Sequence, residues 1–364
     1  MHLKHNYVRR TNCFIARFVV TQAGEVEPQL LWHGESDESN TIHDTISLKD
    51  APAYHYNICG PCYGIYYLWN PWLDEDIGSR CLWNPALYEI KNLPPKIMKR
   101  NISSYMNTNT KSVYNEVYGF GFDPMTVDYK VVIINGCRLE CLNLTDEYGC
   151  KSFLEYFLSI RIYSLRTDSW KYLGDLSKRF YIPPDNSSCH TFVNRSFYWL
   201  GSYKEYAIKH DVIFSIDLAT EECQEIILPD IIIKEEMSYS ECLMVYNGLI
   251  ALVALYKEEC TFDIWTLKGT TWNKELKVQL DRRVWKPIGH YSVDNNLVLF
   301  DSPNCLVLCD PNTKETLELT KETWELKISN YGYDVTCKIV SAYRESLVPL
   351  NDRDFWDQSD ERPW

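Results

Sequence analysis

The sequence predicts an all-β protein and, within that class, a six-bladed β-propeller. Short apolar runs rich in β-branched and aromatic residues alternate with turn residues along the chain, and no segment keeps an apolar pattern at helical period. A strand–turn–strand unit also recurs, at intervals of 80, 53, 49 and 44 residues. All but the first interval lie near the roughly 40–50 residues of a propeller blade. The turns of this unit align on Asn84, Ser164, Asp217, Thr266 and Asp310.

Each propeller blade is a four-stranded antiparallel meander, whose strands we call a to d. An apolar run precedes each copy of the recurring turn, so we expect the turn to join strands c and d. Asp, Asn and Pro suit this position because they preset or cap a tight reversal of the chain. The expected blades are 54–94, 116–176, 189–228, 241–280 and 288–320.

A sixth blade is expected from the two ends of the chain, where strands at 14–20 and 30–32 would join strands at 335–348. Closing the ring in this way would remove exposed strand edges. The long first interval is explained by a polar insert at 98–114 and a loop at 136–156. Seven blades with one degenerate copy is the alternative, whereas two stacked β-sandwiches would fit the length but not the recurring turn.

Composition excludes several classes of protein. The 364 residues exceed what one ordinary hydrophobic core supports, but a ring gives each blade a small core of its own. Lys and Arg number 37 against 50 Asp and Glu, so the net charge of −13 argues against binding nucleic acid through a broad basic surface. No apolar run approaches the 18 or so residues of a membrane span. The 14 cysteines lack framework spacing, which favours a reducing, cytoplasmic location.

No catalytic, metal or cofactor site is predicted. Cys59 and Cys62 have zinc-knuckle or redox-pair spacing, but a structural zinc needs four ligands and no second paired knuckle accompanies them. Adjacent acids such as Glu221 and Glu222 are typical of solvated loops rather than of a carboxylate pair set across a pocket. We therefore expect a protein that is not an enzyme. A propeller lectin or enzyme acting on glycans is the alternative from another class.

Short motifs follow one another in a fixed order along the chain. They include Gly60-Pro61-Cys62-Tyr63-Gly64-Ile65, Leu82-Trp83-Asn84-Pro85-Ala86, Tyr118-Gly119-Phe120-Gly121-Phe122-Asp123-Pro124, Ile162-Tyr163-Ser164-Leu165, Phe197-Tyr198-Trp199-Leu200-Gly201 and Phe262-Asp263-Ile264-Trp265. As an ordered set they resemble the kelch-like F-box-associated interaction domain of plant F-box proteins. Within that group the chain is most similar to the S-locus F-box proteins of gametophytic self-incompatibility. The resemblance covers about residues 10 to 350.

The resemblance implies a substrate receptor of an SCF-type cullin–RING ubiquitin ligase in pollen, with a basic S-RNase as substrate. Such proteins dock a Skp-type adaptor and a cullin through an F-box of about fifty residues, and no F-box pattern is visible here. We expect residues 1–13 to be the remnant that follows a missing F-box, 14–350 to be the propeller domain and 351–364 to be an acidic tail. An F-box-free decoy that binds the same ligand is the alternative.

The expected binding surface lies on the loops that join strands b and c. These loops vary in length, unlike the short c–d turns, and surface loops of this kind commonly carry recognition. Together they hold a charge of −7, just over half of the net charge, which suits a basic partner. The predicted contacts are the acidic Asp74, Glu75, Asp76, Glu147, Glu205, Glu258 and Glu259, with Trp72, Tyr203 and Tyr206 as aromatic anchors.

Overall fold

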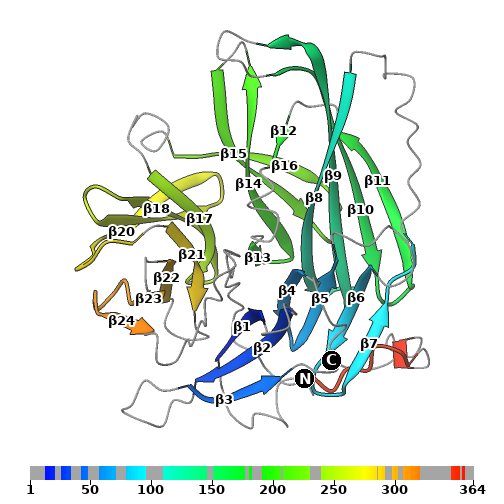
Figure 1. The fold of residues 1–364 in the computed structure, drawn as a ribbon, viewed down its shortest axis with the longest axis horizontal. Coiled ribbons are helices and arrows are strands. Elements are labelled where there is room, and N and C mark those ends of the chain that lie inside the picture. Colours follow the sequence, from blue (N-terminus) through cyan, green and yellow to red (C-terminus); the bar gives the residue numbers. More distant parts are fainter. Residues whose placement is uncertain are drawn as a thin grey trace. The chain divides into compact units, whose positions relative to one another are not determined.

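The computed structural model is nearly all-β, as the sequence predicts (Figure 1). It describes residues 13–20, 26–33, 42–47, 57–70, 79–95, 110–145, 151–176, 180–182, 191–205, 208–229, 239–284, 286–291, 297–301, 306–319, 346–352 and 355–356. These residues form 24 strands in six antiparallel sheets. Nowhere in this part of the chain is there a helix of the length and hydropathy that crossing a membrane requires.

The chain divides into two compact units. The first comprises residues 1–93 and 234–364, and the second comprises residues 94–233. The first unit holds four sheets. Two come from its N-terminal part: one consists of β1 (Cys13–Val20), β2 (Val26–His33) and β3 (Ile42–Ser47), and the other of β4 (Asn57–Cys62), β5 (Ile65–Trp69), β6 (Arg80–Asn84) and β7 (Glu89–Asn92). The other two sheets consist of β17 (Tyr239–Tyr246), β18 (Leu249–Tyr256), β19 (Thr261–Lys268) and β20 (Thr271–Gln279), and of β21 (Lys286–Tyr291), β22 (Leu297–Asp301), β23 (Leu306–Cys309) and β24 (Thr316–Leu319).

The second unit holds two sheets. One has the order β11-β10-β9-β8, from β8 (Thr110–Asp123), β9 (Asp128–Thr145), β10 (Lys151–Ser164) and β11 (Ser169–Leu176). The other has the order β12-β14-β15-β16, with β13 also paired to β14. Its strands are β12 (Phe180–Tyr181), β13 (Thr191–Val193), β14 (Ser196–Glu205), β15 (Ile208–Asp217) and β16 (Cys223–Ile227).

Five of the sheets lie at the positions predicted for five blades, and all five recurring turns join the third and fourth strands as expected. The N-terminal strands form a separate three-stranded sheet, β1-β2-β3. Residues 335–345 of the expected sixth blade lie outside the described residues, so the number of blades and the closure of the ring stay predictions. The described residues 346–350 are not a strand and bind β6 and β7 instead.

The predicted loop at 136–156 proved to be mostly strand. β9 and β10 remain paired beyond the blade core, with Cys137 opposite Phe157 and Thr145 opposite Lys151. Strand β8 likewise begins at Thr110, inside the predicted polar insert. The insert was predicted from its many Asn, Ser and Thr residues, but the intervening Leu, Phe, Tyr and Val residues of both segments favour extended pairing.

The core of the second unit lies between its two sheets. Val132, Ile134 and Ile160 of the first sheet pack with Phe197 and Trp199 of the second. The indole nitrogen of Trp199 donates a hydrogen bond to the carbonyl oxygen of Tyr118, 3.1 Å away. In the first unit, a second core joins residues of β17–β20 to Val307 and Cys309 of β23.

Candidate recognition surface

Four of the five recurring c–d turns share one hydrogen-bonding pattern. The side-chain Oδ1 atoms of Asn84, Asp217 and Asp310 accept the backbone N–H groups two residues further on, over 3.0, 2.8 and 2.8 Å. Ser164 Oγ caps its turn similarly, by accepting the N–H of Thr167 over 3.1 Å. Four of the five aligned polar residues of the sequence repeat therefore cap their turns, whereas Thr266 lies within β19 and donates to Glu275 Oε1.

The same turns also share a strained residue. In each, the residue four positions after the capping residue has a left-handed backbone: Tyr88, Asp168, Glu221 and Lys314 have φ angles of 55, 49, 59 and 64°. The turn between β8 and β9, capped by Asp123, repeats the pattern with Val127 at 50°. A β-branched residue pays the highest steric penalty in this region.

Replacing Val127 with Gly is expected to stabilise the protein by about 1 kcal/mol, because glycine adopts this backbone without strain. Met125→Gly is the matched control, since Met125 is 71% exposed, its φ is not positive, and its hydrogen bond to Asp123 comes from the backbone N–H that glycine keeps. Urea unfolding of both variants checks the prediction. A Val127→Gly midpoint at or below that of the wild type would show that the left-handed turn carries no such strain.

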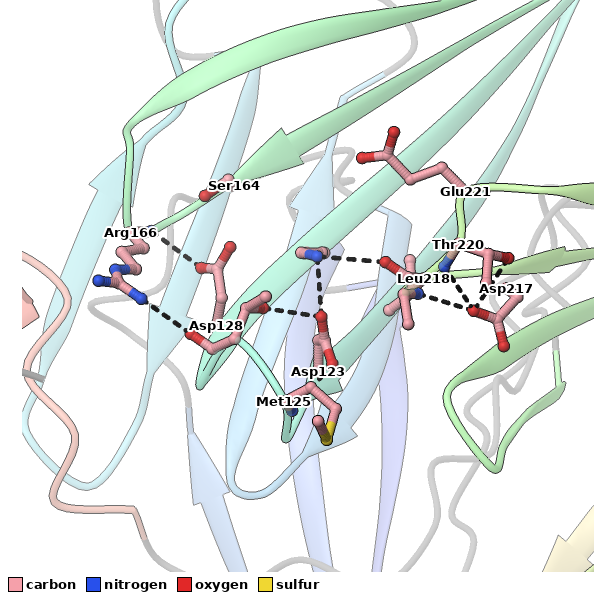
Figure 2. A network of polar contacts seen from close by, with 12 residues as sticks. Asp123, Met125, Asp128, Ser164, Arg166, Asp217, Leu218, Thr220 and Glu221 are labelled. Atoms are coloured by element: carbon pink, nitrogen blue, oxygen red, sulfur yellow. Dashed lines mark hydrogen bonds and ion pairs between the residues drawn. The ribbon is translucent and has the colours of Figure 1, made fainter. Parts of the chain in front are cut away.

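A network of polar contacts joins three turns of the second unit (Figure 2). Lys130 Nζ lies 2.9 Å from Asp123 Oδ2 and 3.3 Å from the carbonyl oxygen of Leu218, in the turn between β15 and β16. Lys171 forms an ion pair with Glu221 of the same turn. The sheet β8–β11 is thereby fixed to the turn of the neighbouring sheet.

The pKa values of the two buried aspartates of this network, Asp123 and Asp128, are shifted in opposite directions. Burial alone would raise the pKa of Asp123, but hydrogen bonds from Lys130, Thr126 and the backbone of Met125 hold it below its ordinary value. Burial raises the pKa of Asp128, even though this carboxylate accepts the N–H of Arg166 over 2.9 Å. Both groups are engaged in internal hydrogen bonds, so the network acts as scaffold.

The predicted contact residues fall mostly outside the described part of the chain. Trp72, Asp74, Glu75, Asp76, Glu147 and Tyr206 are outside it. Tyr203 and Glu205 belong to β14 rather than to a loop, and their backbones pair with His210 and Ile208. Glu258 and Glu259 lie where the sequence predicts, in the turn between β18 and β19, and both are exposed.

The turn between β18 and β19 is braced from the neighbouring strand β20. Gln279 Nε2 donates to the carbonyl oxygens of Glu259 and Cys260, over 3.0 and 3.2 Å. Glu259 Oε2 accepts a hydrogen bond from Thr261 Oγ1 and pairs with Lys277 Nζ, each over 3.3 Å. These partners of Glu259 were missed from the sequence, because Lys277 and Gln279 are distant along the chain.

Glu258 differs from its neighbour. Within the described residues it takes part in no hydrogen bond or ion pair. Its carboxylate is thus accessible to a partner at this tip, beside the exposed Lys257, whereas the carboxylate of Glu259 already pairs with Lys277. The described b–c turn of this sheet is braced by Gln279 and presents the exposed carboxylate of Glu258 next to the exposed Lys257.

Metal and thiol chemistry find no support in the described ranges. They contain no group of three or more His, Cys, Asp or Glu side chains placed to hold a metal ion. Burial raises the pKa of the Cys81 and Cys309 thiols to about 12 and that of Cys223 to about 11. These thiols are protonated at neutral pH and are therefore poor nucleophiles and poor metal ligands.

Comparison with known proteins decides the family. Residues 36–350 match the model of the F-box associated beta propeller domain. The chain belongs to this family. This membership agrees with the ordered motifs of the sequence and with the recurring four-stranded meanders of the structure.

The chain is also similar to F-box proteins of Arabidopsis thaliana. The chain is 24% identical to F-box protein CPR1 over 251 residues, which cover 64% of this chain and 57% of that protein. It is 25% identical to F-box protein At3g07870 over 316 residues, covering 75% and 70%. The chain thus spans less than two thirds of the length of CPR1.

Solved structures of low similarity were also found. Polysaccharide lyase Uly1 has a TM-score of 0.39 at 8% identity, covering 84% of this chain and 76% of that one. Virginiamycin B lyase from Staphylococcus aureus has a TM-score of 0.36 at 10% identity, covering 87% of each chain. Scores this low support no functional argument.

Proposed function

We propose that this F-box-associated propeller is the non-catalytic substrate-recognition part of an SCF-type cullin–RING ubiquitin ligase. Its substrate would bind at the b–c ends of the blades. The observation that carries the proposal is the difference between the two ends of the sheets. At the c–d end the polar side chains cap their own turns, whereas the described b–c turn holds Glu258 out to solvent on a braced tip.

The proposed substrate is a basic protein of the S-RNase type. The predicted b–c loop segments carry a charge of −7 in a chain of net charge −13, which favours encounter with a positively charged surface. We choose a ribonuclease as the substrate because the ordered motifs of the chain resemble those of S-locus F-box proteins. Ubiquitin transfer would be performed by the ligase subunits, which a Skp-type adaptor and a cullin would connect to this chain through an F-box.

Glu258→Lys is expected to lower the association rate with an S-RNase about three- to tenfold at low ionic strength, because it reverses an exposed charge at the proposed contact end. Glu315→Lys is the matched control, since Glu315 is an exposed acid in a c–d turn. Surface plasmon resonance at low and high salt measures both variants, and the difference should shrink at high salt. Equal rates for the two variants would contradict binding at the b–c end.

The decoy alternative differs from the proposal in one respect: a decoy would bind the same S-RNase but would not recruit a ubiquitin ligase. The full gene product is expected to co-purify with a Skp-type adaptor, and the S-RNase should be ubiquitinated only when the adaptor and cullin are present. S-RNase binding without adaptor capture would leave recognition intact and would assign the protein to the decoy class.

A further inference from the structure

The sheet β8–β11 contains a buried arginine. Arg161 belongs to β10, and only 4% of this residue is exposed. It is directly opposite Tyr172 on the edge strand β11, and its Cζ atom lies 5.3 Å from the centre of the tyrosine ring. Its Nη1 atom donates a hydrogen bond to Ser159 Oγ over 3.4 Å. The guanidinium is therefore held between a hydroxyl group and an aromatic face.

No carboxylate neutralises this guanidinium within the described residues. The other buried cation of this part of the chain, Lys130, pairs with Asp123 over 2.9 Å. The side chain of Arg161 has only the hydrogen bond to Ser159 and the contact with the ring of Tyr172. Arginine keeps its charge when it is buried, and a buried charge without a counter-charge is costly. Arg161 is thus a buried cation that the described residues leave uncompensated.

The remaining donors of Arg161 stay accessible. Of its three side-chain nitrogens, Nη1 alone has a hydrogen bond, and none is both fully buried and without a partner. Nε and Nη2 therefore still touch solvent, although almost all of the residue is covered. So small an accessible area suits a small ion better than the surface of another protein.

Further hydrogen-bond donors share this face of the sheet. Ser159 is directly opposite Asn135 of β9, and cross-strand partners project from the same face. The Ser159 hydroxyl, which accepts from Arg161, also has a hydrogen to donate. Glu116, in the same row, is separated from Ser159 by the strand β9, and it accepts the hydroxyl of Tyr118. The groups beside the guanidinium therefore suit an acceptor of hydrogen bonds.

We propose that Arg161 is the centre of a binding site for a small oxyanion that carries a carboxylate or phosphate group. A guanidinium presents a planar fork of N–H donors, which matches two oxygens of such a group. The bound anion would neutralise the buried charge, and Ser159 would donate a further hydrogen bond. This ligand differs in charge and size from the basic protein of the proposed function, and the site does not depend on that function.

Thermal melting of the full chain at neutral pH tests the proposal, in potassium phosphate, acetate or chloride of equal ionic strength. Phosphate or acetate should raise the midpoint by at least about 2 °C over chloride, because an anion that binds only the folded state stabilises it. The two arms tell the phosphate and carboxylate classes apart. Arg161→Met should abolish the rise. Arg166→Met, the matched control, should keep it, since Arg166 lies in the c–d turn of the same sheet and donates to the carbonyl oxygen of Thr126.

The midpoint of Arg161→Met in chloride separates binding from a structural role. Removing an uncompensated buried charge should leave this midpoint unchanged or raise it, whereas loss of a structural arginine would lower it. A lower midpoint would overturn the proposal, as would the absence of a rise with either anion or an equal rise in the wild type and Arg161→Met.

A double-mutant cycle tests whether the chain supplies the anion itself. Asp175 is opposite Ser159 in the strand register. Asp175→Asn is expected to change the midpoint equally in the wild type and in Arg161→Met. A midpoint that Asp175→Asn lowers only when Arg161 is present would make Asp175 the counter-charge and would overturn the proposal.

Discussion

Lys130→Met is expected to destabilise the second unit by about 3–5 kcal/mol, because it leaves a buried carboxylate without its cation. The side chain of Asp123 is fully buried and that of Lys130 is 11% exposed. The substitution also removes the hydrogen bond from Lys130 to Leu218, which ties the two sheets of this unit together. Urea unfolding monitored by tryptophan fluorescence measures the loss.

Lys171→Met is the matched control for this prediction. It removes the other cross-sheet ion pair, but Lys171 is 64% exposed, and pairs of this kind contribute about 0–1 kcal/mol. The double variant Lys130→Met, Asp123→Asn should recover part of the lost stability, since it neutralises the stranded carboxylate. Similar losses of unfolding free energy for the Lys130 and Lys171 variants would show that burial does not determine how much each ion pair contributes to stability.

The pH dependence of the Lys130 variant follows from the direction of the pKa of Asp123. In the wild type this pKa is lowered, so Asp123 contributes stability that is present above about pH 3.9 and is lost as the pH falls through the folded pKa. In Lys130→Met, burial without the cation should raise the folded pKa instead. The deficit relative to the wild type should then shrink as the pH is lowered from 7 towards 4.

Gly121→Val is expected to destabilise the protein by about 3 kcal/mol through overpacking. A Cβ atom at Gly121 would lie 2.9 Å from two ring atoms of Phe192 and from one of Phe197. Phe197 is fully buried in the core between the two sheets of the second unit, so its ring has little room to move. A drop in the thermal midpoint relative to the wild type is the measurement.

A second substitution separates overpacking from other effects of the valine. Phe192→Ala opens space beside Gly121, so it should be less damaging in the Gly121→Val background than in the wild type. Additive losses for the two substitutions would contradict the close packing of β8 against the aromatic rings of the neighbouring sheet.

Local features of the fold could be predicted from the sequence. Asn84, Asp217 and Asp310 marked their turns because capping depends on backbone groups only two residues away. The meanders followed from alternating apolar runs and short turns. The contact of Lys130 with Leu218 could not be found this way, since 88 residues separate them and no local pattern records their meeting.

The candidate site shows the same division. The sequence placed Glu258 and Glu259 together in a b–c turn, which the structure confirms. The sequence could not show that Glu259 is paired and Glu258 is not, because Lys277, the partner of Glu259, comes from strand β20, 18 residues further along the chain. The long pairing of β9 with β10 was missed for a related reason, since backbone pairing tolerates the polar residues that suggested a loop.

The most direct test of the recognition surface is the binding of a panel of S-RNases to the triple variant Asp74→Lys, Glu75→Lys, Asp76→Lys. The three acids belong to the b–c loop that contributes the largest share of the predicted negative charge. We expect the triple variant to bind at least one S-RNase more weakly, with a smaller dependence on salt than the wild type shows. Unchanged affinities for every S-RNase of the panel would contradict recognition through these loops.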